Sequence, residues 1–227
     1  MKLAIIIPAY NEEKTILSVL KSLPSGIKGI SEIVTIVVND GSEDKTSRLA
    51  SSIKNATVIN LPVNMGVGVA TVTGFEIAKK LQADMIITMD ADGQHDPRDI
   101  AKLIKPIINR QSDIVIGVRL FAGQMPVLRR IGNFLLSLLT WLVYYKWVRD
   151  SQSGMKAISI SAIEKMDLKS VGFEICSEII GECQRLHLVV DEIPIRTVYS
   201  PYSKKKGQNW LNGINILTKL LSLKIKL

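Results

Sequence analysis

This 227-residue chain contains only two cysteines and two histidines. Cys176 and Cys183 are seven residues apart in a predicted helix, about two turns, which is too far for an unstrained disulfide. The sequence shows no cluster of cysteine and histidine with the spacing of zinc ligands. We therefore predict two reduced thiols and neither a disulfide framework nor a zinc site.

Aromatic residues are also scarce, at 5% of the chain, although the formal net charge is +8. Such a charge attracts nucleic acid, a lipid surface or phosphorylated substrates. Nucleic-acid binding by stacking needs aromatic residues interleaved with basic ones, and here the aromatic residues gather in and around one apolar segment. We predict no nucleic-acid partner, and we retain a non-catalytic nucleotide- or nucleic-acid-binding protein only as the alternative from another class.

Strand and helix patterns alternate through the first half of the chain. Apolar, β-branched runs predict strands, each followed by a segment with helical spacing of apolar residues. The predicted strands are residues 5–7, 33–38, 57–61, 85–89 and 113–118; the predicted helices are residues 12–20, 43–53, 70–81 and 97–105. This order predicts an α/β fold in which helices flank a mostly parallel sheet. The N-terminal apolar run is too short for a secretory signal and is read as the first strand.

The most informative polar residues are Asp90 and Asp92, which follow an apolar strand. If the strand continues, the two side chains share one face and both offer oxygens to a hard divalent cation, Mg²⁺ or Mn²⁺, holding a diphosphate. An acidic surface turn is the ordinary alternative for an isolated Asp-x-Asp pair. Open α/β sheets bind ligands beyond the carboxyl ends of their strands, and this position favours the metal-site hypothesis.

Two other strand ends have both an ordinary and a functional reading. The Asp40–Ser42 segment forms either a turn with Ser42 as a helix N-cap, or a site where Asp40 accepts hydrogen bonds from a base or ribose. The glycines of the 64–68 segment either make a flexible connection or let backbone amides approach a phosphate. The chain lacks both the P-loop pattern and the Gly-x-Gly-x-x-Gly dinucleotide pattern.

The segments 7–13, 38–42, 64–66 and 89–95 together resemble the inverting family 2 glycosyltransferases of GT-A fold. Three later segments, 117–119, 153–156 and 192–195, resemble the branch of dolichyl-phosphate mannose synthase and polyprenyl-phosphate glucosyltransferases. The likeness implies one GT-A domain over residues 1–227. Residues 1–120 would be the nucleotide-sugar-binding half, and residues 121–227 the half facing acceptor and membrane.

The resemblance also implies roles for individual residues. Those that would bind the nucleotide sugar are Pro8, Ala9, Tyr10, Glu12, Asp40, Asn64, Gly66 and Asp90. Those that would hold the metal are Asp90, Asp92 and Gln94; those that would approach the acceptor phosphate are Arg119, Arg129 and Lys204. Asp90, Asp92 and Arg119 would be the catalytic set. For Arg129 an ordinary solvated helix charge remains an alternative, and both Lys204 and Lys156 stand where the family often has arginine, whose bidentate geometry a lysine lacks.

We therefore predict a metal-dependent transfer of a hexose from a nucleotide-diphosphate sugar, of the GDP-mannose or UDP-glucose type, to polyprenyl (dolichyl) phosphate with inversion. A phosphate monoester with a second pKa near 6 is mostly ionised at neutral pH, so no strong base is needed. The alternative is a sugar-hydroxyl acceptor, which requires a base such as Glu174 or Glu178. The Gln-x-x-Arg-Trp motif of processive polysaccharide synthases is absent.

Two segments of the second half predict contact with a membrane surface. The apolar segment 134–148 would form a helix of about 22 Å, shorter than the roughly 30 Å hydrocarbon layer. Its aromatic residues and basic flanks are typical of a helix lying at the interface, with a buried core or dimer helix as the alternative. Residues 211–226 predict a basic amphipathic helix. We expect a cytoplasmic protein peripherally attached to the cytoplasmic face of the membrane.

Overall fold

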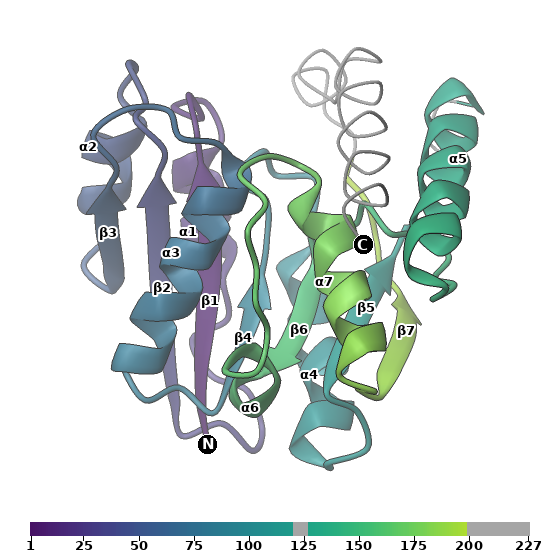
Figure 1. The fold of residues 1–227 in the computed structure, drawn as a ribbon. Coiled ribbons are helices and arrows are strands. Elements are labelled where there is room, and N and C mark those ends of the chain that lie inside the picture. Colours follow the sequence, from purple (N-terminus) through teal and green to yellow (C-terminus); the bar gives the residue numbers. More distant parts are fainter. Residues whose placement is uncertain (120–126, 199–227) are drawn as a thin grey trace.

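The computed structural model describes residues 1–119 and 127–198, and for residues 127–129 the backbone alone. Seven strands form one sheet with helices on both faces (Figure 1). The elements are β1 (Lys2–Ala9), α1 (Ile16–Ser22), β2 (Glu32–Asn39), α2 (Thr46–Ser51), β3 (Ala56–Asn60), α3 (Val67–Lys80), β4 (Met85–Thr88), the 3₁₀ turn η1 (Pro97–Asp99), α4 (Ile100–Ile108), β5 (Ile114–Val118), α5 (Val127–Tyr144), β6 (Lys156–Ser159), α6 (Ile160–Ile163), α7 (Ile175–Arg185) and β7 (Val190–Pro194).

The strand order is β3-β2-β1-β4-β6-β5-β7, and β6 is antiparallel to both of its neighbours. All other pairings are parallel, which confirms the predicted mostly parallel α/β sheet. The second half of the chain inserts β6 between two strands of the first half, so both halves build the same sheet. The carboxyl ends of β1, β2, β4 and β5 consequently lie along one edge.

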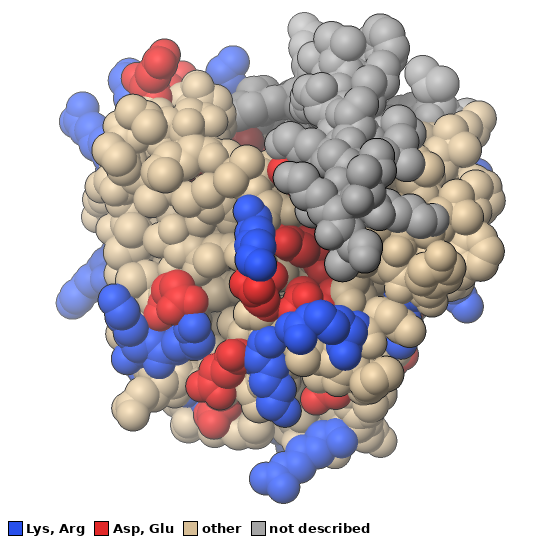
Figure 2. Space-filling model, viewed as in Figure 1, with Lys and Arg blue, Asp and Glu red and all other residues tan. Residues whose placement is uncertain are grey.

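One face of the molecule is covered by α3, α6 and α7, and acidic and basic side chains are interspersed on it (Figures 1 and 2). Surface ion pairs on this side include Lys169 with Asp167 at 2.7 Å and Arg185 with Glu182 at 2.6 Å. Exposed pairs of this kind contribute little to stability because water screens them.

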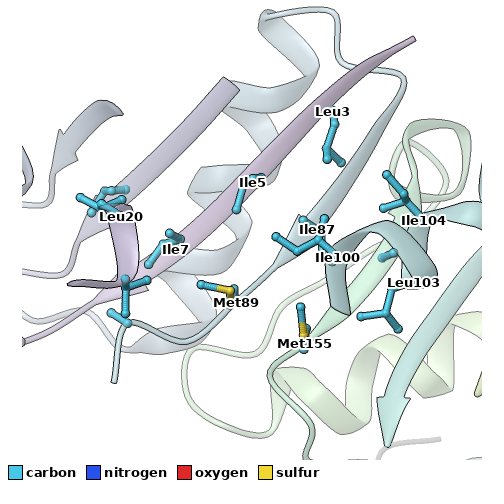
Figure 3. Close-up of a cluster of buried hydrophobic side chains, with 14 of the residues drawn as sticks. Leu3, Ile5, Ile7, Leu20, Ile87, Met89, Ile100, Leu103, Ile104 and Met155 are labelled. Carbon is cyan, nitrogen blue, oxygen red and sulfur yellow. The ribbon is translucent and has the colours of Figure 1, made fainter. Parts of the chain in front are cut away.

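Residues of β1 alternate between two apolar layers. Leu3, Ile5 and Ile7 face the layer that also contains residues of β4, α1 and α4 (Figure 3). Ala4 and Ile6 face the layer beneath α3 and α7. Because successive side chains of a strand point to opposite faces, a strand buried on both sides reads as a continuous apolar run. Residues 3–7 are all fully buried.

The structure corrects the start of two predicted helices. Helix α1 begins at Ile16 rather than at residue 12, because Asn11 adopts a left-handed conformation with φ 52° and residues 13–15 form a turn. Helix α2 begins at Thr46, and Ser42 is not its N-cap. The Ser42 hydroxyl instead accepts the N–H of Asn11 at 2.9 Å. Pro97 lies in the first turn before α4, as predicted.

Helix α5 runs from Val127 to Tyr144, so it starts before the predicted residue 134 and does not extend to residue 148: Tyr145 adopts φ 58° and terminates the helix. Among the residues that the structure describes, no helix is both long and apolar enough to cross a membrane. Both cysteines lie on α7 and are free, as predicted. The expected amphipathic helix 211–226 lies outside the described residues.

Candidate active site

Asp90 and Asp92 lie in the loop after β4, but not on a continuing strand. Strand β4 ends at Thr88, and Asp92 occupies the turn that follows. The strand argument for a shared face is therefore wrong, although the two carboxylates still influence each other. Burial, together with the nearby charge of Asp90, raises the pKa of Asp92 to about 7; the charge of Glu12 adds to this rise. The loop thus concentrates negative charge.

Gln94 forms two hydrogen bonds to the Asp92 carboxylate. Its backbone N–H donates to Asp92 Oδ1 at 2.9 Å, and its side-chain Nε2 donates to the other carboxylate oxygen. These bonds fix the Asp92 side chain within the loop. The three residues predicted as metal ligands therefore lie in one loop, in which Gln94 bonds to Asp92.

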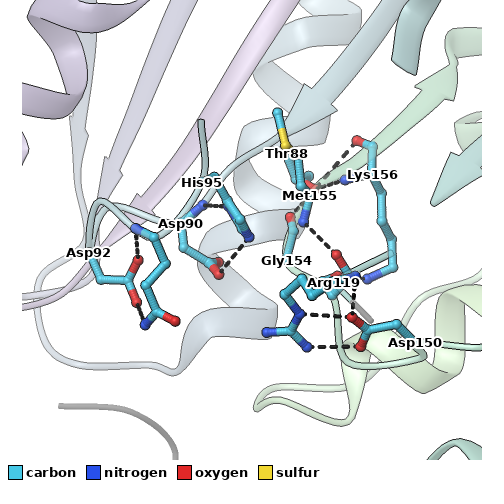
Figure 4. A network of polar contacts seen from close by, with 11 residues as sticks. Thr88, Asp90, Asp92, His95, Arg119, Asp150, Gly154, Met155 and Lys156 are labelled. Carbon is cyan, nitrogen blue, oxygen red and sulfur yellow. Dashed lines mark hydrogen bonds and ion pairs between the residues drawn. The ribbon is translucent and has the colours of Figure 1, made fainter. Parts of the chain in front are cut away.

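His95 is a residue to which the sequence analysis gave no role. Its side chain is buried beneath the loop, Nδ1 accepts the backbone N–H of Asp90 at 3.2 Å, and Nε2 lies 3.7 Å from Asp90 Oδ2 (Figure 4). Burial lowers the pKa of His95, and the charge of Asp90 opposes this only in part. A neutral imidazole therefore lies against the Asp90 carboxylate.

Arg119 follows β5 and forms a bidentate ion pair with Asp150, a residue that the sequence analysis did not identify. Arg119 Nε and Nη2 each donate to one Asp150 oxygen at 2.8 Å, and the Arg119 backbone N–H donates to Oδ2 at 3.2 Å. Burial alone would raise the pKa of Asp150, but the charge and hydrogen bonds of Arg119 outweigh it and lower that pKa. The charge of Arg119 also lowers the pKa of His95, so the Arg119 guanidinium lies near the Asp90 loop.

Lys156, the second position where the family often has arginine, is fully buried at the start of β6. Its ammonium group donates to the carbonyl of Ser153. Its charge also contributes to the lowered pKa of Asp150. The buried Lys156 side chain thus bonds to the 150–155 loop and is not exposed to solvent.

Asp40 holds a neighbouring loop in place. Its carboxylate oxygens accept the backbone N–H groups of Met65, at 2.7 Å, and Gly66, at 2.9 Å. Gly66 has φ 102°, a left-handed value that favours glycine. Asn64 is exposed in the same loop. Asp40 therefore fixes the 64–66 loop, which neither interpretation of the sequence predicted, and the proposed contact with a base would involve an already bonded carboxylate.

The remaining nucleotide-site residues lie around the end of β1. Pro8 and Ala9 are its last two residues, half-buried and buried respectively, and Tyr10 is 40% exposed just beyond them. Glu12 is buried, and its carboxylate accepts the Thr15 hydroxyl at 2.8 Å. These residues lie on the same sheet edge as Asp90.

The two acids considered as bases for a hydroxyl acceptor bond to backbone instead. Glu178 accepts the N–H groups of Lys169 and Ser170, each at 2.9 Å, and Glu174 accepts that of Gly172 at 3.1 Å. Of the predicted acceptor-site residues, Arg129 is described by its backbone alone and Lys204 lies outside the described residues. Val198, which leads toward Lys204, donates its N–H to the Gln94 carbonyl at 2.9 Å.

Comparison with known proteins gives consistent matches. The family model "Glycosyl transferase family 2" matches residues 4–167. An uncharacterized protein of Methanocaldococcus jannaschii is 41% identical over 228 residues, covering 97% of this chain and 91% of the relative. The UDP-N-acetylglucosamine–dolichyl-phosphate N-acetylglucosaminyltransferase of Methanococcus voltae is 38% identical over 243 residues, covering 97% of this chain and 95% of the relative.

A solved structure shares the fold. Glucosyl-3-phosphoglycerate synthase of Mycobacterium tuberculosis, in complex with Mn²⁺, UDP and glucosyl-3-phosphoglycerate, superimposes with a TM-score of 0.75 at 18% identity, covering 98% of this chain and 79% of that one. This likeness agrees with the GT-A architecture expected from the sequence. With the family model covering most of the chain and the two relatives matching almost its whole length, this protein belongs to glycosyl transferase family 2.

Proposed function

We propose that the protein transfers a sugar, with inversion at the anomeric carbon, from a nucleoside-diphosphate sugar to a polyprenyl phosphate such as dolichyl phosphate. The observation that carries this proposal is the pairing of opposite charges at one sheet edge. Asp90 and Asp92 follow β4, and Arg119 follows β5 nearby, paired with Asp150 of the loop before β6. The acidic loop could bind a metal cation that also binds the diphosphate of the donor. The positive charge of Arg119 could attract the phosphate of the acceptor.

The residues present fit a divalent cation, Mg²⁺ or Mn²⁺. The raised pKa of Asp92 reflects burial and repulsion from nearby acids, which a cation would relieve. Among residues 1–119 and 127–198 no three acidic, histidine or cysteine side chains converge as a metal site. Asp90 and Asp92 would therefore hold the ion together with the Gln94 amide oxygen, water and the diphosphate, as is usual for Mg²⁺. The bound cation would act as a Lewis acid that neutralises charge on the leaving nucleoside diphosphate.

The chain's own residues suit an acceptor that arrives ionised. Asp150 is a poor general base because its pKa is lowered, and the carboxylates of Glu174 and Glu178 accept backbone N–H groups. A phosphate oxygen needs no base, since its second pKa is about 6. Arg119, oriented by Asp150, would attract that phosphate. Arg129 and Lys204 are proposed to complete the phosphate site.

We propose a UDP-sugar as donor, with UDP-N-acetylglucosamine as the first candidate. The support is the Methanococcus voltae relative, a UDP-N-acetylglucosamine–dolichyl-phosphate N-acetylglucosaminyltransferase whose match covers 97% of this chain and 95% of the relative. UDP-glucose and GDP-mannose are the donors to compare with it, because both the base and the hexose are read by local geometry.

We also propose that the outward face of α5 contacts the membrane that carries the acceptor lipid. Phe134, Leu135 and Trp141 are 55%, 50% and 40% exposed, whereas Ser137 and Thr140 on the opposite side are fully buried. A helix at the surface of a soluble protein normally exposes polar side chains, so the apolar exposed face is the unusual feature of α5. Large exposed apolar patches mark surfaces that meet a membrane or a partner.

The experiment is transfer of labelled sugar from each of the three donors onto polyprenyl phosphate, with product analysed by mass spectrometry and its anomeric configuration by NMR. We expect one donor to give a lipid-phosphate sugar of inverted configuration, and Asp92→Asn to lower the rate by at least about 100-fold. The exposed acid Glu164, changed to Gln, is the matched control. Label that enters only oligosaccharide acceptors would refute the lipid-phosphate proposal.

A further inference from the structure

The Asp90 carboxylate lies directly over the backbone of Gly154, in the loop before β6. A Cβ atom at position 154 would overlap both carboxylate oxygens of Asp90. Any residue other than glycine would therefore compete with the carboxylate for the same space. The φ of Gly154 is not left-handed, so the requirement for glycine here comes from this close approach and not from backbone conformation.

Gly154 is itself held against the end of β4. The Thr88 hydroxyl donates to the Gly154 carbonyl at 2.7 Å and accepts the Lys156 N–H at 3.2 Å (Figure 4). Thr88 is the last residue of β4 and pairs with Lys156 of β6. Because Thr88 precedes Asp90 by two residues, one hydroxyl fixes the distance between the Asp90 backbone and the Gly154 backbone.

His95 restrains the same carboxylate through a second contact. Its Nδ1 accepts the Asp90 backbone N–H, which leaves the imidazole proton on Nε2, and Nε2 lies 3.7 Å from Asp90 Oδ2. The His95 side chain is 1% exposed, so packing holds its ring in place. Both the main chain and the side chain of Asp90 thus meet one rigid ring.

We propose that Gly154 and His95 are positioning residues that together hold the Asp90 carboxylate in the single orientation in which it binds the cation. This inference rests on the proposed function, because it assumes that Asp90 is a metal ligand. Groups that orient a metal ligand typically change metal affinity by about 10- to 100-fold when they are replaced. Gly154 acts by leaving the space free, and His95 acts by hydrogen bonding and packing.

The test measures Mn²⁺ affinity in the presence of UDP, by electron paramagnetic resonance and calorimetry, and separately measures UDP affinity without metal. We expect Gly154→Ala to weaken Mn²⁺ binding by about 10-fold or more and to change metal-free UDP binding by less than about twofold, because Asp90 alone is displaced. His95→Asn keeps an acceptor near the Nδ1 position but loses the Nε2 contact, and should weaken Mn²⁺ by a smaller factor. Because asparagine is smaller than histidine, His95→Asn introduces no steric overlap. It therefore tests the positioning of Asp90 even if Gly154→Ala proves unstable.

Gly74→Ala is the matched control, because a Cβ atom there would overlap the Ile6 side chain in the core under α3. It should lower the unfolding temperature while leaving Mn²⁺ affinity unchanged. If Gly154→Ala and His95→Asn bind Mn²⁺ like the parent protein while Asp92→Asn does not, the positioning inference is overturned and the metal site stands. If Asp90→Asn and Asp92→Asn also retain full Mn²⁺ affinity, the proposed metal site itself fails.

Discussion

The Arg119–Asp150 pair joins the loop after β5 to the loop before β6, and both partners are largely removed from water. The Asp150 side chain is 2% exposed and that of Arg119 is 15% exposed. We predict that Asp150→Asn lowers the free energy of unfolding by about 3 kcal/mol, because breaking a buried pair leaves an uncompensated charge. Urea unfolding followed by circular dichroism measures this. Asp167→Asn, which removes the exposed partner of Lys169, should cause no measurable change.

The same pair predicts a pH dependence. The pKa of Asp150 is lower in the folded protein than in the unfolded chain, where an aspartate titrates near 3.9. The ionised form therefore stabilises the fold fully above about pH 5, and this contribution is lost as the pH falls through the folded pKa. The difference in unfolding free energy between the parent protein and Asp150→Asn should shrink steadily below about pH 4. A difference that stays constant down to pH 3 would contradict this assignment.

At the residue scale, the sequence predicted the groups that follow strands and missed those that support them. Asp90, Asp92 and Arg119 could be proposed as site residues because they lie within a few residues of the ends of the apolar strands β4 and β5. Asp150 contacts Arg119 from 31 residues away, and Gly154 bonds to Thr88 from 66 residues away. Nothing in local spacing reports such contacts. Only the insertion of β6 between β4 and β5 brings these residues together.

At the scale of elements, the buried side of α5 combines small polar residues with Leu136 and Val143, and its exposed side carries large apolar residues. The Ser137 hydroxyl accepts the N–H of Ser151 at 3.1 Å, and Thr140 Oγ1 lies 2.8 Å from Ser177 Oγ on α7. Gln152 Nε2 donates to the same Ser177 oxygen at 2.9 Å. A buried set of hydroxyl and amide groups thus joins α5, α7 and the loop that contains Asp150.

We predict that Thr140→Val destabilises the protein by about 1–2 kcal/mol, although valine has a similar shape and is more apolar. The Thr140 hydroxyl donates to the Leu136 carbonyl, so it accepts the Ser177 O–H. Valine would remove this acceptor, and a buried donor without an acceptor costs about this much even though Ser177 still accepts from Gln152. Leu135→Ser on the outward face is the comparison, since this side chain is 50% exposed and its loss leaves no buried cavity. Leu135→Ser should leave unfolding nearly unchanged and weaken binding to lipid vesicles. Equal stability of the two variants would contradict the assigned orientation of α5.

Prediction of the elements succeeded where local pattern determines structure. The five strands of the first half are apolar runs long enough to recognise, and all five are present. Strand β6 has only four residues and starts with a buried lysine, and its antiparallel direction comes from pairing with β4 and β5. The early end of α5 depends on Tyr145, a residue type that rarely adopts a left-handed conformation. Such features depend on tertiary contacts that periodicity does not encode.

At the scale of the whole molecule, the positive charge is distributed unevenly along the chain. Residues 199–227 contain six lysines and no acidic residue, so they carry six of the eight net positive charges. On the face formed by α3 and α7, by contrast, both signs are interspersed (Figure 2). The attraction to anionic surfaces expected from the composition is therefore assigned mainly to the C-terminal segment.

This distribution predicts that a triple change of Lys204, Lys205 and Lys206 to Gln weakens binding to vesicles containing anionic lipid. Each basic residue near such a surface contributes about 1 kcal/mol, so the three together should account for about a 100-fold loss in partition coefficient at low salt. The loss should diminish as ionic strength rises, because salt screens exposed charges. Changing the exposed Lys21, Lys28 and Lys54 to Gln removes the same charge from the first half of the chain. If the two triple variants lose equal affinity in vesicle co-sedimentation, net charge alone governs binding. A selective loss for the Lys204–Lys206 variant assigns the membrane contact to the C-terminal segment of residues 199–227.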